Sequence, residues 1–313
     1  IEWVDAEVPE EFAAGEVKEL SVGKKTYQIS DIIAQGMYGP VRHASIGKEK
    51  LVMKHVLKAK EGSGCDDPHH EIQALYELGK LSQRHHSIAN LVGALESKSS
   101  YYFFLEYGGK DLQGHLLGQH NRQFTGSKRV GNQLLFSSVE KKQIFKQIMQ
   151  GVQHIHSVGY CHLDISLDNC VATYDEEGNL IVKLIDFGLS ERIIQEGALK
   201  FSGQQALRLK TIAGKLPYIA PERLIKNIEF DGPAADVWSC GCLLLELLRG
   251  VDDKIWIWAY ASKEDVYYRA YTDHGLVKLT KLVPGLARLS PETQSLACKL
   301  LDPDPLGRPH YTV

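Results

Sequence analysis

The sequence predicts a bilobal α+β protein: a small β-rich N-lobe, a larger mainly helical C-lobe and a cleft between them. Its 313 residues are more than one hydrophobic core usually organises. Strand-like runs predominate in residues 25–107, and helical periodicity predominates in residues 108–313. Residues 1–24 are acidic and are expected to form an N-terminal extension. Because ligands commonly bind in clefts between lobes, we expect the functional residues to converge at the junction.

The N-lobe is predicted to be a sheet with a single helix. The runs TYQISDIIAQ, VRHASIG and KEKLVMKHVL have strand character and are separated by turns. Pro68 favours a helix start, and apolar residues follow with helical spacing at positions 72, 75, 78 and 81. NLVGAL and YYFFLEY predict two further strands, so the sheet is expected to end near Tyr107.

Helices follow Gly108 and Gly109 in the predicted C-lobe. The run VEKKQIFKQIMQGVQHIHSVG has an apolar face made of Ile144, Ile148, Val152 and Ile155. Short strands are expected at NCVAT and LIVKLID, and a buried helix at DVWSCGCLLLELLRG. Two polar segments, 118–133 and 195–210, are expected to be surface insertions.

Composition excludes several classes of function. A net charge of −3 gives no support to binding of nucleic acid or of a charged membrane surface. The longest apolar run, at 241–248, contains Glu246 and is far shorter than the roughly 20 residues that cross a bilayer. The N-terminus lacks the cationic start and apolar run of a signal peptide, although a leader removed earlier would leave no trace.

The six cysteines include no C-x-x-C pair of the kind that binds metals. We expect buried, reduced thiols in preference to disulfides or metal ligands. An intracellular reducing compartment is therefore favoured, while the compartment itself and the oligomeric state stay unknown.

The segment HLDISLDN sets Asp164 and Asn169 on one loop. Further along, Asp186 ends the apolar run IVKLID, where a carboxylate needs a cation. Asn169 and Asp186 offer the hard oxygen ligands that Mg²⁺ prefers, and Asp164 can act as a base or orienting group for an attacking hydroxyl. The two segments together are much more specific than either alone.

Two features of the N-lobe suggest phosphate binding. Gly36 and Gly39 lie between strand-like runs, where glycines let backbone N–H groups approach a polyphosphate, although a plain hairpin turn with two glycines is more common. Lys54 ends an apolar strand and must reach either solvent or an anion, which Glu71 in the following helix can supply.

In this order, the motifs resemble the eukaryotic protein kinase family, of which the chain would be a divergent serine/threonine-like member. The resemblance spans about residues 27–309 and rests on AQGMYGPV, VMK, EIQALYEL, LEYGGKDL, HLDISLDN, DFG, YIAPE, DVWSCG and DPDPLGRP. It implies the bilobal kinase fold and an activity that depends on ATP and Mg²⁺. The γ-phosphoryl group would pass to Ser or Thr hydroxyls of a protein substrate.

The resemblance also implies a role for each matching residue. Lys54 would hold the α- and β-phosphates and pair with Glu71. Asn169 and Asp186 would bind Mg²⁺, and Asp164 would orient the acceptor hydroxyl. Further nucleotide contacts would come from Ala34, Gly36, Gly39, Val41, Val52, Glu106, Tyr107 and Val171. The two hinge residues at 106 and 107 would present backbone groups to the adenine.

Three other matches are structural. Glu222 and Arg308 would form a buried ion pair. Asp236 would hold the catalytic loop, which is the segment HLDISLDN at residues 162–169, from below. Their loss is expected to affect stability more than chemistry.

Two departures from the family pattern affect nucleotide binding and regulation. Ala34 stands in place of the first glycine of the phosphate loop, so weaker ATP affinity is expected at most. Leu163 replaces the catalytic-loop arginine, which removes the usual cationic receiver for a phosphorylated activation loop. Activation by phosphorylation of Ser202 or Thr211 is therefore less expected than constitutive competence.

Ser166 is the departure that bears on catalysis. At this position the family usually has a lysine, which neutralises charge on the transferred phosphoryl group. Ser166 cannot do so. We hypothesise that Lys215 sends its ammonium into this space, with the Ser166 hydroxyl near Asp164; the alternative is that Lys215 points to solvent. A separation between Lys215 and the Asp164 carboxylate of more than about 6 Å would count against compensation.

Two interpretations of function stay open. An active protein kinase is supported by the retention of Lys54, Glu71, Asp164, Asn169 and Asp186. The alternative is a pseudokinase, a nucleotide-binding or scaffolding module without turnover. The polar segments are either solvated loops or a docking surface for acidic substrates, built on Arg122, Lys128, Arg129, Lys200, Arg208 and Lys210.

Overall fold

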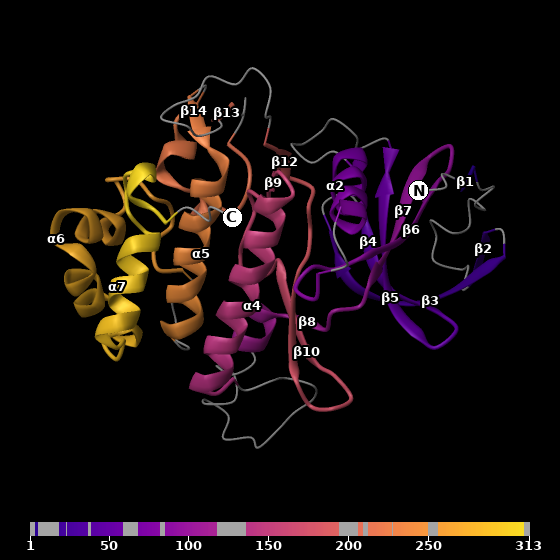
Figure 1. Cartoon of the computed structure of the whole chain (residues 1–313), viewed down its shortest axis with the longest axis horizontal. Coiled ribbons are helices and arrows are strands. Elements are labelled where there is room, and N and C mark those ends of the chain that lie inside the picture. Colours follow the sequence, from indigo (N-terminus) through magenta and orange to yellow (C-terminus); the bar gives the residue numbers. More distant parts are fainter. Residues whose placement is uncertain are drawn as a thin grey trace.

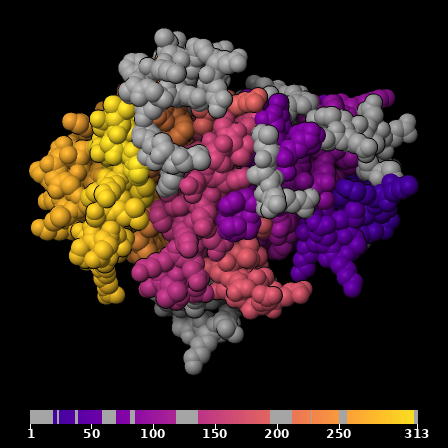
Figure 2. All heavy atoms as spheres, in the orientation of Figure 1, coloured from indigo at the N-terminus to yellow at the C-terminus, as the bar shows by residue number. Residues whose placement is uncertain are grey.

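A computed structural model of the chain confirms the bilobal α+β architecture, with a sheet-rich N-lobe joined to a helical C-lobe (Figure 1). In the space-filling view the indigo and purple N-lobe lies at one end and the yellow C-terminal helices at the other (Figure 2). The structure describes residues 4–5, 19–22, 24–36, 39–58, 68–81, 85–117, 136–193, 206–208, 212–226, 228–249 and 256–309.

The N-lobe contains one mixed sheet and one described helix. The strands span Val4–Asp5 (β1), Glu19–Val22 (β2), Lys25–Gln35 (β3), Pro40–Ile46 (β4), Glu49–Leu57 (β5), Leu91–Glu96 (β6) and Ser100–Glu106 (β7). Their spatial order is β1-β6-β7-β5-β4-β3-β2. Helix α2 (Pro68–Leu81) stands between this sheet and the C-lobe (Figure 1).

Both edges of the sheet are made by residues that precede position 25. Strand β1 pairs in parallel with β6, and β2 pairs antiparallel with β3. The sequence assigned residues 1–24 to an extension because two- and four-residue strands carry almost no periodic signal. The boundary at residue 25 stays a prediction, but short parts of the extension belong to the sheet.

The C-lobe is built on helices α4 (Ser138–Ser157), α5 (Gly232–Arg249), α6 (Val266–Leu282) and α7 (Pro291–Leu300). Helix α4 begins with a capping box, in which Ser137 and Glu140 each accept the other's backbone N–H. Helix α5 is buried along almost its whole length, as its apolar composition predicts.

The described part of the C-lobe also contains short strands. They are Lys110–Asp111 (β8), Tyr160–Cys161 (β9), Cys170–Tyr174 (β10), Leu180–Leu184 (β11), Glu191–Arg192 (β12), Ala206–Arg208 (β13) and Glu229–Asp231 (β14). They pair as β11-β10-β8, β12-β9 and β13-β14. The strands predicted at NCVAT and LIVKLID are confirmed as β10 and β11.

Hydrophobic packing differs between the lobes. The C-lobe has one continuous core, which also takes in Ala74, Leu75 and Leu78 of α2. The N-lobe core is divided into two smaller clusters, one of which includes Leu51, Met53 and the other Ile72. Helix α2 therefore belongs to the cores of both lobes.

Several sequence predictions concern the surface and the cysteines. Four of the five described cysteines are buried free thiols and the fifth, Cys298, is exposed. Cys65, the segment 118–133 and most of 195–210 lie outside the described residues. Within the described part of the chain, no helix combines the length and the apolar composition that spanning a membrane requires.

Candidate active site

Lys54 on β5 joins the two lobes through a pair of carboxylates. Its Nζ lies 2.6 Å from Oε2 of Glu71 on α2 and 3.1 Å from Oδ1 of Asp186, which follows β11. Alternation along β5 buries Met53 in the core and turns Lys54 to the opposite face of the sheet. The predicted pairing of Lys54 with Glu71 is thus present.

The charges in this cluster stabilise one another. Burial alone would lower the pKa of Lys54, but the negative charges of Asp186 and Glu71 outweigh it and raise that pKa above its usual range. The positive charge of Lys54 in turn lowers the pKa of Asp186. The Asp186 side chain remains 42% exposed, so its carboxylate is accessible from outside the protein.

Asp236 on α5 holds the catalytic loop from below. Its fully buried carboxylate accepts the backbone N–H groups of His162 at 2.8 Å and Leu163 at 2.7 Å. A third bond joins it to Nε2 of His156 on α4 at 2.9 Å. Burial would raise the pKa of Asp236, but its bonds to His156 and His162 lower it overall. Leu163, with φ of 63°, is held by these bonds in a conformation that non-glycine residues rarely adopt.

Asp164 is fixed by residues on both sides of it. Nδ2 of Asn169 donates to Oδ2 of Asp164 at 2.6 Å and to its backbone oxygen at 2.8 Å. The backbone N–H of Lys215 donates to Oδ1 at 3.1 Å. The carboxylate is only 13% exposed and its orientation is therefore set before any substrate binds.

Lys215 makes the contact that the compensation hypothesis requires. Its Nζ lies 3.1 Å from Oδ2 of Asp164, well inside the separation that would have counted against it, and 4.0 Å from Oδ2 of Asp168. Ser166 behaves differently: it is fully buried, and its hydroxyl has no hydrogen-bond partner among the described residues. A catalytic role for either residue stays a prediction, and a buried Ser166 can act only through its neighbours.

The glycine turn lies between β3 and β4, where residues 37 and 38 are outside the described part of the chain. The N–H of Gly36 donates to the carbonyl of Gly39 at 2.9 Å. A Cβ at Gly39 would lie 2.1 Å from the carbonyl oxygen of His55, so only glycine fits this close approach to β5. Ala34 pairs with Val41, and Val41 with Lys54, which brings the turn beside the lysine.

The hinge residues are already engaged within the protein. The N–H of Glu106 donates to Asn90 at 2.9 Å and that of Tyr107 to Lys50 at 3.3 Å. The Glu106 carboxylate is held by Nδ2 of Asn90 at 2.7 Å and by Nζ of Lys183 at 3.1 Å. The predicted backbone contacts to an adenine would therefore have to use carbonyl groups at these two positions. Of the predicted apolar contacts, Val171 is buried, and Val41 and Val52 are half-buried.

The side chains present fit a Mg²⁺ ion bound together with phosphate. Asn169 uses its amide nitrogen on Asp164, so its amide oxygen is the atom left to face a cation. Asp186 adds an accessible carboxylate, and Mg²⁺ is commonly held by one or two such groups plus substrate phosphates. Among the described residues, no group of three or more His, Cys, Asp and Glu side chains could hold a metal ion by itself.

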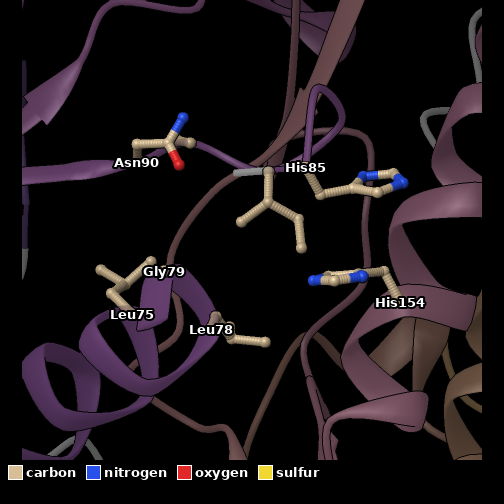
Figure 3. A pocket seen from close by; sticks show the side chains of 8 residues that line it. Leu75, Leu78, Gly79, His85, Asn90 and His154 are labelled. Carbon is tan, nitrogen blue, oxygen red and sulfur yellow. The ribbon is translucent and has the colours of Figure 1, made fainter. Parts of the chain in front are cut away.

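A separate pocket is lined by none of the predicted site residues (Figure 3). It is bordered by α2, residues 85–90 and His154 of α4. The rings of His85 and His154 stack with their centroids 4.7 Å apart. Burial, together with the positive charge of neighbouring histidines and Lys183, lowers the pKa of His85 to about 4, so its ring is neutral at physiological pH.

The sequence missed two residues of this site. Arg223 donates to the backbone of the catalytic loop, and Asp168 approaches Lys215. Burial raises the pKa of Asp168. Asp168 was visible as an acid within the catalytic-loop motif, whereas an arginine that binds backbone oxygens leaves no pattern of side-chain types.

Comparison with known proteins agrees with this geometry. Residues 27–312 match the family described as protein kinase domain. The chain is 31% identical over 304 residues to CBL-interacting serine/threonine-protein kinase 15 of Arabidopsis thaliana, covering 93% of this chain and 60% of that protein. It is 34% identical over 261 residues to serine/threonine-protein kinase HAL4/SAT4 of Saccharomyces cerevisiae, covering 79% and 38%. For maternal embryonic leucine zipper kinase of Danio rerio the figures are 32% over 230 residues, 72% and 29%.

A sheet-rich N-lobe tied by a lysine to a helical C-lobe that carries Asp164, Asn169 and Asp186 is the arrangement of the protein kinase fold. The chain belongs to the protein kinase family, as its match over residues 27–312 shows. It spans no more than 60% of the length of these three relatives.

Proposed function

We propose that the chain is an active protein kinase that uses ATP and Mg²⁺ to phosphorylate Ser or Thr hydroxyls of proteins. The observation that carries this proposal is the position of Lys54, whose Nζ contacts both Glu71 and Asp186. These three groups come from β5, α2 and the segment after β11, so the cluster is assembled from parts of the chain that are far apart in sequence. The serine/threonine preference is supported by the names of the relatives.

Each of these side chains would have a defined task. Lys54 would bind the phosphates of ATP, while Glu71 and Asp186 fix its ammonium in place. Asp164 would accept a hydrogen bond from the acceptor hydroxyl, orient its oxygen toward the γ-phosphorus and receive the proton. Bound through Asn169 and Asp186, Mg²⁺ would neutralise charge on the phosphates.

Lys215 would supply the positive charge that Ser166 lacks. Its ammonium lies beside the Asp164 carboxylate, which is where the acceptor oxygen and the transferred group must meet. A cation at that point stabilises charge that develops during transfer. Its 31% exposure leaves room for it to turn toward a phosphate without breaking a buried structure.

Phosphate transfer to a generic basic protein with Mg·ATP tests the main proposal. Asp164→Asn should lower the rate by about 10²-fold or more, because the amide cannot take a proton. Asp273→Asn, on the exposed surface of α6, is the matched control and should keep the wild-type rate. Equal, background-level rates for wild type and Asp164→Asn would favour the pseudokinase.

A second pair of variants tests Lys215. Lys215→Gln should lower kcat by about 10²-fold, the usual effect of losing one stabilising group, with little change in the KM for ATP. Lys215→Arg keeps the charge and should retain much more of the rate. If both variants match the wild type, Lys215 is a surface residue and the charge comes from elsewhere.

The predicted cellular setting stays a proposal. The buried free thiols of Cys161, Cys170, Cys240 and Cys242 support a reducing, intracellular compartment. Burial raises the pKa of each, which keeps it unreactive. A labelled copy of the full-length protein followed by microscopy would check this.

A further inference from the structure

Arg223 lies where the catalytic loop, residues 162–169, meets the segment that begins at residue 212. It belongs to the 3-10 helix η3 (Pro221–Leu224) and is only 6% exposed. Its Nη1 donates to the carbonyl of Leu163 at 2.7 Å, and its Nη2 to the carbonyl of Ala213 at 3.0 Å. One rigid guanidinium thus joins residue 163, which directly precedes Asp164, to residue 213, which lies two positions before Lys215.

A buried arginine is costly unless its hydrogen bonds repay the loss of water. Here the two acceptors are backbone carbonyls, and a planar fork of donors can bridge them at fixed separation, which a lysine cannot do. The guanidinium also lies over the ring of Phe230 on β14, 5.5 Å from its centroid. The site is therefore built to hold three segments at one relative position.

The hydrogen bonds of Arg223 take the place of a phosphate-binding arginine, because position 163 is a leucine. Leu163 is 1% exposed and packs in the apolar core, so it offers no cation to a phosphate group. Arg223 instead binds the carbonyl of the same residue. The connection between catalytic loop and following segment is thus present without any phosphate.

Backbone pairing holds the rest of this segment independently. Strand β12 pairs with β9, which directly precedes His162, and β13 pairs antiparallel with β14, which carries Phe230. Residues on both sides of 194–205 are thereby attached to the C-lobe by hydrogen-bonded strands. The described strands that precede Lys215 are therefore attached to the C-lobe through β9 and β14.

We propose that Arg223 is a positioning residue that locks residues 212–216 against the catalytic loop, so that Asp164 and Lys215 are aligned without phosphorylation of this segment. The inference rests on the proposed kinase activity for its kinetic part only. The alignment itself is a structural property that can be measured in an inactive protein.

Hydrogen exchange on phosphatase-treated protein, confirmed by mass to carry no phosphate, is the first test. Arg223→Met should speed exchange in peptides covering 160–166 and 212–220 by about tenfold or more, since the N–H groups of Leu163 and Lys215 lose their fixed partner geometry. Arg223→Lys should have an intermediate effect.

The matched control is Arg249→Met. Arg249 is buried to a similar degree, but its ion-pair partner is Glu246 on the same helix, at 3.1 Å. Equal effects of the two methionine variants on these peptides would overturn the proposal.

Kinetics provide the second test. Dephosphorylated wild type should keep its full kcat, and Arg223→Met should lose at least about tenfold in kcat while its Kd for Mg·ATP changes less than about twofold. Arg249→Met should keep kcat. A wild type that loses activity on dephosphorylation would overturn the proposal, whereas a wild type that is inactive in both states would refute the kinase activity and leave the exchange result to decide the role of Arg223.

Discussion

Lys54 in the N-lobe and Asp164 in the C-lobe belong to the same site but are held by different means. Lys54 depends on two ion pairs, at 2.6 and 3.1 Å, on a side chain that is 21% exposed. Asp164 lies in a loop whose backbone is bonded to Asp236 and Arg223, both almost completely buried. The N-lobe thus contributes an adjustable group and the C-lobe a fixed one.

The cores of the two lobes show the same difference. The C-lobe has one continuous apolar core, whereas the core of the N-lobe is split into two small clusters on the two sides of its sheet. Ion pairs that are partly exposed contribute little to folding and can be remade when a ligand arrives. Buried hydrogen bonds cannot be remade cheaply, so the acceptor hydroxyl would be oriented by the rigid lobe.

The largest expected effect comes from removing the buried hydrogen bonds that fix the catalytic loop in the C-lobe. Asp236→Ala removes the acceptor for His162, Leu163 and His156 inside the protein. We expect the free energy of unfolding to fall by about 3–5 kcal/mol, with loss of activity. Urea unfolding measures this, with Asp236→Asn as a milder variant that keeps one acceptor oxygen. A loss below about 1 kcal/mol would mean that the catalytic loop does not depend on Asp236.

On the adjustable side, activity and stability should separate. Lys54→Arg keeps the positive charge but moves it relative to Glu71 and Asp186. We expect a rate loss of about 10²-fold, since small misplacements at a reacting centre are costly, with stability changed by less than about 1 kcal/mol. Lys58→Arg, which changes a nearby lysine paired with Glu96 at 2.6 Å, is the control for both measurements. A stability loss as large as that of Asp236→Ala would remove the distinction between the lobes.

Gly109, two residues after the hinge residue Tyr107, should behave as part of the rigid C-lobe. Gly109 has φ of 99°, and a Cβ there would lie 2.1 Å from the carbonyl oxygen of Ala172 on β10. Gly109→Ala should therefore lower the free energy of unfolding by about 2–3 kcal/mol, through backbone strain and a displaced β8–β10 pairing. Gly178→Ala, with φ of 83° but open space around it, isolates the cost of the backbone angle alone. Equal thermal shifts for the two variants would show that the contact with Ala172 is relieved at no cost.

The sequence predicted the features that depend on side-chain type and spacing, and it did not predict those that depend on backbone interactions. Long periodic segments such as α4 and α5, and the pairing of Lys54 with Glu71, were predicted because side-chain type and spacing determine them. The contact of Lys215 with Asp164 was one of two alternatives that the resemblance to protein kinases left open, because Ser166 stands where a lysine would neutralise charge on the transferred phosphoryl group.

Interactions of the backbone could not be predicted. Arg223 binds carbonyls of residues 60 and 10 positions away, and every residue has a carbonyl, so no sequence pattern marks the partner. The pairing of β13 with β14 involves strands of three residues, too short to show alternation. Glu106 and Tyr107 were predicted to present backbone groups to an adenine, but their N–H groups donate to the carbonyls of Asn90 and Lys50, because β7 lies between β6 and β5 in the sheet.

The smallest expected effect concerns the junction between the lobes, near His85. Residues 87–89 pair with Leu184 of the C-lobe, and the N–H of Ser87 also donates to Nδ1 of His85 at 3.2 Å. Burial lowers the pKa of His85 to about 4, below its unfolded value of roughly 6.5. As the pH falls, the unfolded chain therefore takes up a proton at His85 before the folded protein does. The contribution of neutral His85 to stability is complete above pH 6.5 and is lost as the pH falls toward 4.

His85→Asn, which retains an acceptor for Ser87, should make the loss of stability between pH 6.5 and 5 smaller by about 1 kcal/mol, allowing for partial exposure. Thermal unfolding at matched pH values measures the difference, with the exposed His274→Asn on α6 as control. If both variants follow the wild-type pH dependence, acid acts on the lobes themselves and not on the segment that joins them.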